Sequence, residues 1–326
     1  VAVDNVSDAD MDSLLIRYFI VDAQRKSRQV SSKKLQPLKG RESEIASIEL
    51  STVGMSGKNT LQMMVNPDQD QPEQFHFNNY MELDFFVKND RQNPLLDVTF
   101  DGRHILNGEI VSATPEILIQ LEDNSEFLVM DDTSDFRVFI TAPGGTEKQL
   151  HFSDELIFIP AQLPENRAKI IYTPEFKQDG KYRLRVSAQD KSGNASGKDD
   201  YLIEFEIVTK SSISHVVNYP NPFSTSTRFV FTLTGSKLPD DMQIQIMTVT
   251  GKMVKEIHMA ELGPIRIGNN ISDYAWDGRD EFGDQLANGV YLYRIRTKMG
   301  GESIEHRESA SDRFFKKGYG KMYLMR

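Results

Sequence analysis

The chain has 326 residues, of which 39% are hydrophobic and 10% aromatic, so it can bury cores and is neither disordered nor fibrous. Asp and Glu outnumber Lys and Arg by 48 to 38, and the formal net charge of −10 disfavours binding to nucleic acid and to anionic membrane surfaces. The absence of cysteine excludes thiol catalysis, disulfides and Cys-ligated zinc within these residues.

No apolar run approaches the ~20 residues that span a bilayer, so we expect no membrane-spanning helix. The start, VAVDNVSDADMD, has neither the charged head nor the apolar middle of a signal peptide. An export signal would therefore have to lie outside these residues.

Apolar and polar residues alternate along most of residues 1–91, as in SLLIRYFIVDA, EIASIELST (44–52), NTLQMMVNP and YMELDFFVKND. Alternation with period two is typical of half-buried strands, and no stretch longer than about three turns has the apolar spacing of an amphipathic helix. In FHFNNY the two aromatic residues Phe75 and Phe77 are two apart, followed by Asn78 and Asn79. In YLYRIR, Tyr291 and Tyr293 are likewise two apart. We predict that both aromatic pairs belong to the core, with sugar binding as the alternative.

Residues 92–211 continue the pattern, from PLLDVTFDGRHILNGEIVSATPEILIQLED to a predicted hairpin. KYRLRVSAQD places Tyr182, Leu184, Val186 and Ala188 on one face, and YLIEFEIV follows after the turn-rich loop DKSGNASGKDD. Strands separated by short Gly, Pro, Asn and Asp clusters are typical of sandwiches rather than of βαβ units. The chain is therefore predicted to be all-β.

The third region begins with NYPNPFSTSTRFVFTL, where Pro220 and Pro222 restrict the backbone and push Tyr219 and Asn221 toward extended geometry. Proline cannot donate to a sheet ladder, so this segment is predicted to be a stiff entry to a sandwich, with Phe223 as an apolar plug. A polyproline ligand for a partner is the alternative. MQIQIMTVTGKMVKEI predicts two strands joined by a turn at Gly251, and YAWDGRDEFGDQLANGVYLYRIRTK contains the only Trp, which we assign to the core.

Three tandem Ig-like antiparallel β-sandwiches follow from this pattern, with limits 1–91, 92–211 and 212–326. The junctions are predicted in the polar segments KNDRQNP (88–94) and VTKSSISHVVNYPNP (208–222). Both are short, so we expect a semi-rigid series of modules rather than freely moving ones.

The sequence contains no motif of a known catalytic, cofactor-binding or metal-binding site, so we assign no residue to such a site. There is no H-E-x-x-H and no G-x-S-x-G, and the histidines are scattered singly at His76, His104, His151, His215, His258 and His306. Three acidic loops are alternatives for calcium, although Asp-Gly and Ser-Gly-Asn are also selected by tight turns. Their residues are Asp277, Asp280 and Asp284; Asp131, Asp132 and Asp135; and Asp190, Asn194, Asp199 and Asp200.

The succession NPF, TGKMVKEI and WDGRDEFGDQLANGVYLYRI, over about 218–298, resembles the FlgD-like immunoglobulin-type domain, which is similar to C-terminal domains of large surface and secreted proteins of Bacteroidota. The resemblance implies architectural roles for matched residues at the entry, the hairpin turn, the surface loop and the strand after it. These are Pro222 and Phe223, Gly251, Trp276, Asp277 and Gly278, and Gly289, Tyr291 and Tyr293.

After that strand, MGGESIEHRESASDRFF intervenes before KKGYGKMYLMR, and this end resembles the tails of gingipain-type, PorU-like proteins of the type IX secretion system. Residues 94–123 resemble the module before such a tail, and residues 1–91 resemble a CARDB-like adhesion module. The resemblance implies a peptidase domain upstream. Whether the tail is a cleavable export signal or a permanent domain stays open.

We therefore expect a non-catalytic portion of a larger exported cell-surface protein, a monomer that serves as a spacer and in type IX secretion or anchoring. Its partners would be secretion or surface-attachment machinery, and its location extracellular or outer-membrane associated. The alternatives are an adhesion module for glycan or protein, and an accessory region of an upstream gingipain-type cysteine peptidase. No cofactor is expected, with calcium as the alternative.

Overall fold

The structure is a computed structural model that describes residues 1–88, 90–307, 315–316 and 318–326. It is built from β-strands, most of them antiparallel, with two short 3-10 turns, η1 (Thr133–Asp135) and η2 (Met259–Glu261). The predicted all-β fold of antiparallel sandwiches is therefore confirmed. The chain forms two compact units, Val1–Gln92 and Asn93–Arg326. Among the described residues, no helix has the length and apolar character needed to cross a membrane.

The first unit consists of two layers of unequal size, which we call the first sandwich. A four-stranded sheet in the order β3-β2-β5-β6 faces a two-stranded sheet, β1-β4. The strands are β1 (Ala2–Asp4), β2 (Leu15–Val21), β3 (Ser27–Lys34), β4 (Ser43–Ile45), β5 (Gly57–Val65) and β6 (Tyr80–Val87). Alternation along β2 buries Ile16, Tyr18 and Ile20 against the smaller layer.

The predicted strand over residues 44–52 is wrong beyond its first residues. Only Ser43–Ile45 forms a strand, and residues 46–52 have no strand partner. Ile48 and Leu50 still pack against the core from this irregular segment. The alternate apolar residues of this segment are therefore packed against the core although the segment is not part of a sheet.

The second unit begins with two sheets that enclose one core, here called the second sandwich. Their strand orders are β11-β10-β14-β15-β8 and β12-β13-β9-β7. The strands are β7 (Leu95–Phe100), β8 (Glu109–Val111), β9 (Ile117–Glu122), β10 (Phe136–Thr141), β11 (Glu147–Gln149), β12 (Leu156–Ile159), β13 (Arg167–Tyr172), β14 (Gly180–Ala188) and β15 (Tyr201–Ile207). The predicted hairpin is confirmed as β14 and β15, because Tyr182, Leu184, Val186 and Ala188 are all buried in this core.

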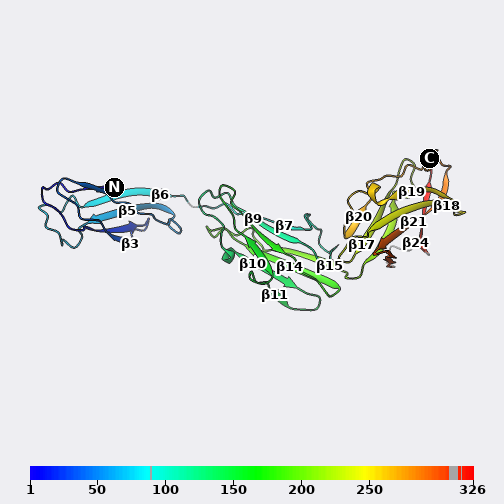
Figure 1. The fold of residues 1–326 in the computed structure, drawn as a ribbon, viewed down its shortest axis with the longest axis horizontal. Helices are drawn as coiled ribbons and strands as arrows, with labels where there is room; N and C mark the ends of the chain where they lie inside the picture. The colour runs from blue at the N-terminus through cyan, green and yellow to red at the C-terminus, as the bar shows by residue number, and fades with distance from the viewer. Residues whose placement is uncertain (89, 308–314, 317) are drawn as a thin grey trace. The chain divides into compact units, whose positions relative to one another are not determined.

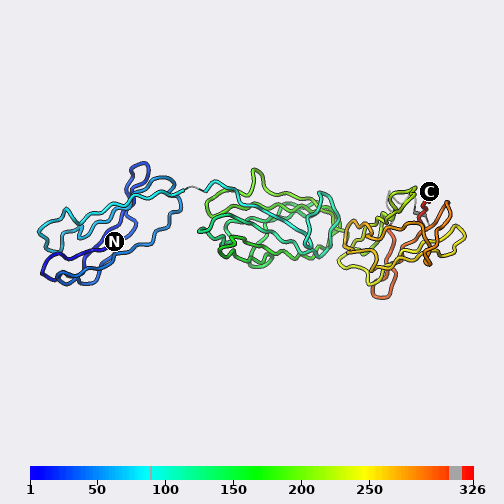
Figure 2. The backbone as a smooth tube through the Cα atoms, turned by 90° about the horizontal axis from the view of Figure 1, so that it is seen from above, coloured from blue at the N-terminus to red at the C-terminus, as the bar shows by residue number. Residues whose placement is uncertain are grey.

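The third sandwich, in the same unit, has the sheets β20-β17-β16-β23 and β19-β18-β21-β25-β24, and β22 pairs with β21. Figure 2 shows the chain passing from the strands of the second sandwich, in green, to those of the third, in yellow to red. The strands are β16 (Ser212–Tyr219), β17 (Arg228–Thr234), β18 (Asp241–Thr248), β19 (Met253–His258), β20 (Gly268–Ile271), β21 (Gly289–Met299), β22 (Glu302–Ser303), β23 (Glu305–His306), β24 (Phe315–Lys316) and β25 (Tyr319–Leu324).

The insertion in the tail, residues 299–315, is described only in part, because residues 308–314 lie outside the described residues. The segment after it returns to the fold as β25, which pairs with β21 from Gly289↔Leu324 to Tyr293↔Gly320. Met322 and Leu324 are fully buried. Gly320 lies under the ring of Tyr293, where any Cβ would overlap the ring atoms. The end of this chain is therefore an integral strand of the third sandwich.

The predicted plug and core residues of the third sandwich are confirmed. Phe223 and Trp276 are buried, with ring centroids 5.5 Å apart, and Trp276 meets Tyr291 at 5.8 Å. Gly251 forms the β18–β19 turn with a φ of 87°, a conformation that glycine adopts without strain. The bonds before Pro220 and Pro222 are both cis.

The prediction that 208–222 is a turn-prone junction is wrong over most of its length. Ser212–Tyr219 forms β16, whose Ile213 and Val216 are buried in the third core. Serine and histidine made the segment look like a linker, but its alternate apolar residues supply one face of a strand. The division of the chain into domains 1–91, 92–211 and 212–326 stays a prediction.

The second and third cores adjoin through main-chain contacts. The N–H of Ala113 donates to the carbonyl of Gly235 at 3.1 Å. At Gly268, which has a φ of 99°, a Cβ would lie 2.5 Å from the carbonyl oxygen of Ile110. Close approach of β8 and β20 therefore requires glycine at position 268.

Candidate binding groove

The acidic loop DGRDEFGD is organised as turns. Asp280 Oδ1 accepts the N–H groups of Phe282 (3.0 Å) and Asp284 (2.9 Å). Asp277 accepts the N–H of Arg279 and forms an ion pair with its side chain at 3.2 Å. These carboxylates therefore have protein partners, as the turn interpretation of the sequence requires.

The loop DKSGNASGKDD has the same organisation at its start. Both carboxylate oxygens of Asp190 accept from Asn194, each at 2.8 Å, and Asp200 forms an ion pair with Arg185 at 2.6 Å. No sequence pattern had linked Asp123 to this region, yet its carboxylate lies within 4.8 Å of that of Asp190, and both side chains are buried. Calcium binding at this loop stays the untested alternative to the predicted turn.

In the loop DDTSD the ammonium group of a lysine lies among the three Asp carboxylates. Lys191 Nζ lies 2.9 Å from Asp135, 3.5 Å from Asp131 and 3.9 Å from Asp132. Partial burial lowers the pKa of Lys191, but the hydrogen bond and charge of Asp135, with the charge of Asp132, outweigh it and raise that pKa. The ammonium of Lys191 therefore offsets part of the negative charge of these three carboxylates.

We expect Lys191→Ala to destabilise the second sandwich by about 1–3 kcal/mol, because the buried carboxylate of Asp135 loses its cation. Since the folded pKa of Lys191 is raised, its contribution is complete below the unfolded pKa of ~10.4 and is lost as the pH rises through the folded value. Amide exchange of residues 93–211 measures the effect, with Lys198→Ala, an exposed lysine of the same β14–β15 loop, as control. Equal exchange in the two variants would contradict this role.

The aromatic pairs predicted to lie in the core have different outcomes. Tyr291 and Tyr293 are buried in the third sandwich, which confirms the prediction for that pair. For the other pair it is wrong, because Phe75 is 58% exposed and Phe77 is 82% exposed, with ring centroids 5.7 Å apart. They lie in an irregular loop before β6, where no opposing layer covers them.

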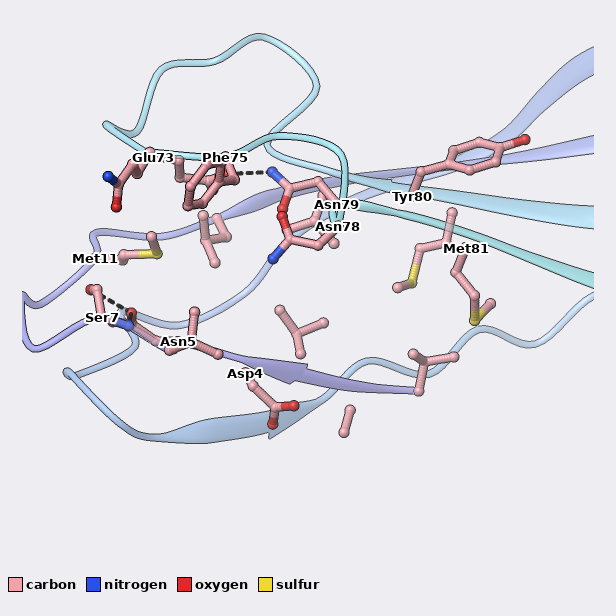
Figure 3. A pocket seen from close by; sticks show the side chains of 18 of the residues that line it. Asp4, Asn5, Ser7, Met11, Glu73, Phe75, Asn78, Asn79, Tyr80 and Met81 are labelled. Carbon is pink, nitrogen blue, oxygen red and sulfur yellow. Dashed lines mark hydrogen bonds between the residues drawn. The ribbon is translucent and has the colours of Figure 1, made fainter.

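A groove of about 530 Å³ opens beside Phe75 in the first sandwich (Figure 3). Its floor is apolar and includes Val3, Leu14, Met63 and Val65. Its polar rim comes from Asp4, Asn5, Ser7, Glu73, Gln74, Asn78, Asn79 and Tyr80. The groove exists because the two-stranded layer is too small to cover the four-stranded sheet completely.

Glu73 holds the loop that forms one wall of the groove. Its carboxylate accepts from Asn66 Nδ2 at 3.1 Å and from Asn79, and it lies 3.4 Å from His76 Nδ1. These bonds close the loop between β5 and β6 and so present Phe75 to solvent. The side chains of Gln74 and Asn78 make no hydrogen bond to any described residue.

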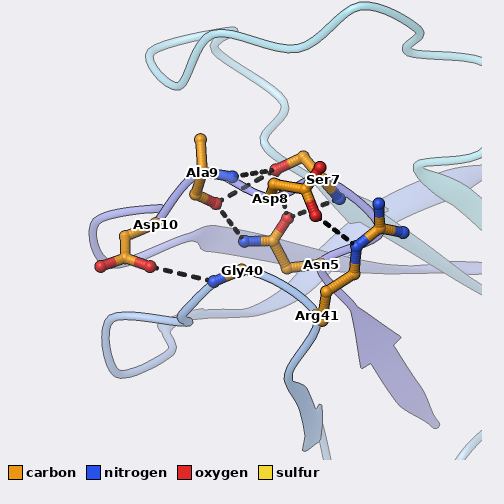
Figure 4. Close-up of polar contacts among 7 residues, drawn as sticks. All are labelled: Asn5, Ser7, Asp8, Ala9, Asp10, Gly40 and Arg41. Carbon is orange, nitrogen blue, oxygen red and sulfur yellow. Dashed lines mark hydrogen bonds and ion pairs between the residues drawn. The ribbon is translucent and has the colours of Figure 1, made fainter.

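Asn5 organises the opposite wall (Figure 4). Its Nδ2 donates to the carbonyls of Ala9 (2.7 Å) and Leu38 (3.1 Å), while its Oδ1 accepts from Ser7 Oγ at 2.7 Å. Gly40 passes so close to this turn that a Cβ would lie 2.5 Å from the carbonyl oxygen of Asp8. The hydrogen bonds of the Asn5 side chain therefore fix the main chain that forms this wall.

Tyr80, where β6 begins, donates its hydroxyl to Glu82. Desolvation, and then this bond and the Glu82 charge, raise the pKa of Tyr80 to about 12. The same bond and one from Gln62 lower the pKa of Glu82. Glu82 is therefore an anion at neutral pH.

No protein-family model and no curated protein matches the chain. Among solved structures, it is similar to dimeric latent PorU from Porphyromonas gingivalis, with 14% identity and a TM-score of 0.30, covering 96% of this chain and 29% of that one. It is also similar to a tetra-tandem repeat in the extending region of a large adhesion protein (12%, TM-score 0.28, covering 98% and 68%) and to the Escherichia coli adhesin FdeC (11%, TM-score 0.23, covering 82% and 74%). At this level of identity and TM-score, the similarities carry no argument about function.

Proposed function

We propose that this chain is a non-catalytic portion of a larger exported bacterial surface protein. Its first two sandwiches act as a spacer, and its third sandwich is a FlgD-like module for type IX secretion or anchoring. One observation supports the proposal: the residues of the third region that match the FlgD-like motifs have structural roles in the core and in the surface loop. Phe223, Trp276, Tyr291 and Tyr293 fill its core, and Asp280 closes its surface loop.

The outward surface of the third sandwich is then available for recognition. Phe282, at the tip of the loop after Trp276, is 92% exposed. The loop is held by the bonds to Asp280 and by Glu281, whose N–H donates to the carbonyl of Val254 on β19 at 2.9 Å. A fixed loop that presents a large apolar side chain is suited to docking on a partner protein. The mechanism would be surface complementarity without bond-making.

The test is export from a Bacteroidota cell that has the type IX system. A fluorescent reporter joined to residues 212–326 is expected to reach the cell surface or medium, whereas deletion of these residues from the full-length protein is expected to retain it inside the cell. Deletion of residues 1–91 is the matched control and is expected to leave export intact. Normal export without residues 212–326 would show that the third sandwich is not the export module.

A second candidate function is adhesion through the first sandwich. The observation that favours it is the exposed pair Phe75 and Phe77 beside a groove with an apolar floor and a polar rim. Large exposed aromatic side chains at such a rim are typical of interaction sites. In this case the first sandwich would bind while the other two project it.

A further inference from the structure

The strand β6 is the edge of the four-stranded sheet, and half of its main-chain groups face away from the sheet. The N–H of Val65 donates to the carbonyl of Asn79 at 2.8 Å, so these two residues form a hydrogen-bonded pair. Such pairs alternate along an antiparallel ladder, which places Met81 and Leu83 in bonding positions toward β5. The N–H and C=O groups of Glu82 and Asp84 therefore point outward, and no described strand pairs with that edge.

The inner face of β6 is also incompletely covered. Leu83 lies opposite the buried Leu61 and shares its face of the sheet, yet Leu83 is 55% exposed. Met81 and Phe85, on the same face, are only partly buried. The layer opposite consists of two strands of three residues each, which is too short to reach this edge.

A second unpaired edge borders the same opening. Val1 and Asn5 use their main-chain groups to bond Ala46 and Glu42 on the β4 side of β1. The alternation along the ladder turns the main-chain groups of Ala2 and Asp4 away from β4. The groove, which is lined by residues 1–7 and by Tyr80 and Met81, lies between these two strands (Figure 3).

The charged side chains that line the groove have one sign. Asp4 and Glu73 line the groove, Glu82 lies on β6, and none of the described residues that line the groove is Lys or Arg. Asp84 on the outer face of β6 already has Lys58 as its partner at 2.7 Å. The opening therefore favours a partner with basic side chains.

Pairing of β6 with β6 of a second copy fits these charges poorly. An antiparallel pair of identical strands would bring Glu82 and Asp84 of one copy against the same carboxylates of the other. Like charges directly opposite each other destabilise a strand pair. A different chain with the complementary pattern is the better occupant.

We propose that the first sandwich binds an extended peptide segment of a partner protein by addition of a strand to β6. The segment alternates apolar side chains, which cover Leu83 and enter the groove, with Lys or Arg side chains, which face Glu82. Its main chain bonds the outward N–H and C=O groups of Glu82 and Asp84. This inference rests on the adhesion role proposed for the first sandwich and is independent of export by the third.

The probe is a fluorescein-labelled peptide that alternates Val with Lys over about eight residues, the length of β6. Fluorescence anisotropy with the whole chain is expected to show saturable binding that weakens as salt is raised. A matched peptide with Glu in place of Lys is expected to bind at least about tenfold more weakly. Residue-level amide exchange is expected to show slowing at Glu82 and Asp84 when the Lys peptide is bound.

Asp84→Pro removes an outward N–H that β5 does not use, so the sheet keeps its ladder while the edge is blocked. We expect at least about tenfold weaker peptide binding, because a main-chain bond is lost and the ring obstructs the strand. The matched control Asp84→Asn keeps the N–H and is expected to change affinity by about threefold or less. Unchanged amide exchange along β5 shows that the proline variant is folded.

Leu83→Lys is a second variant that leaves the ladder intact and places a charge on the face that the peptide covers. It is expected to weaken binding about as much as Asp84→Pro, while Phe86→Gln, an uncharged polar change on the opposite face, is expected to leave it near wild type. Equal binding by the wild type and Asp84→Pro would overturn the proposal. So would a preference for the Glu peptide, or dimerisation that Asp84→Pro abolishes.

A glycan array of neutral oligosaccharides tests the alternative that the groove binds carbohydrate. Glycan binding that is lost in Phe75→Ala, without peptide binding, would replace the strand-addition proposal with carbohydrate recognition. Silence of the array together with peptide binding supports strand addition. The export assay has a separate readout, so its failure would leave the peptide result unchanged, and failure of peptide binding would leave export unchanged.

Discussion

A chain that stops at Gly318 is expected to lose the cooperative structure of the third sandwich. The deletion removes β25, which lies between β21 and β24 in its sheet and contributes Met322 and Leu324 to the core. Emptying one such buried aliphatic position costs about 2–5 kcal/mol, and domains have only about 5–15 kcal/mol of stability. Loss of two positions and of the ladder to β21 should therefore exceed what the sandwich can tolerate.

The readouts are tryptophan fluorescence and amide exchange. Trp276 is the only Trp, so a red-shifted emission reports this sandwich alone, and exchange within 212–318 is expected to become rapid while residues 93–207 stay protected. Lys321→Ala is the control, because that side chain is exposed on the same strand. A truncated chain with buried tryptophan emission would show that β25 is dispensable.

The second large effect is expected for Trp276→Ala, which should destabilise the third sandwich by about 3–5 kcal/mol. The indole is fully buried between Phe223 and Tyr291, and its Nε1–H donates to the carbonyl of Arg279 at 2.8 Å. The substitution therefore opens a cavity and also removes the hydrogen bond to the Arg279 carbonyl.

Calorimetry of the whole chain, together with amide exchange over 212–326, measures this loss. Phe282→Ala is the matched control, since it also removes a large aromatic side chain from the loop after Trp276 but one that is 92% exposed. We expect it to change stability by no more than about 0.5 kcal/mol. Similar losses in both variants would refute the assignment of Trp276 to the core.

The fold class and much of the core could be predicted because they depend on local alternation. β14 places Tyr182 and Leu184 on one face by its period alone, and the structure buries both. β16 was missed for the opposite reason. Serines, a histidine and the nearby prolines resembled a linker. Its pairing with β17, the next strand, and with β23, which is distant in sequence, shows that it is a strand.

The groove could not be predicted, because it depends on the relative size of two layers rather than on any short pattern. Phe75 and Phe77 have the spacing of sheet residues, but Glu73 bonds Asn66 and Asn79 and folds the segment into a loop instead. The cation in the DDTSD loop is likewise distant in sequence, since Lys191 arrives from beyond β14. Such long-range contacts are not visible in local composition.

The position of β25 also bears on how the protein is made. Its end bonds Phe223, at the entry to the same sandwich, through the N–H of Phe223 to Tyr323 and the N–H of Met325 to Phe223. Translation supplies this strand last of all the strands described, so β21 waits with an open edge until residue 324 has been synthesised.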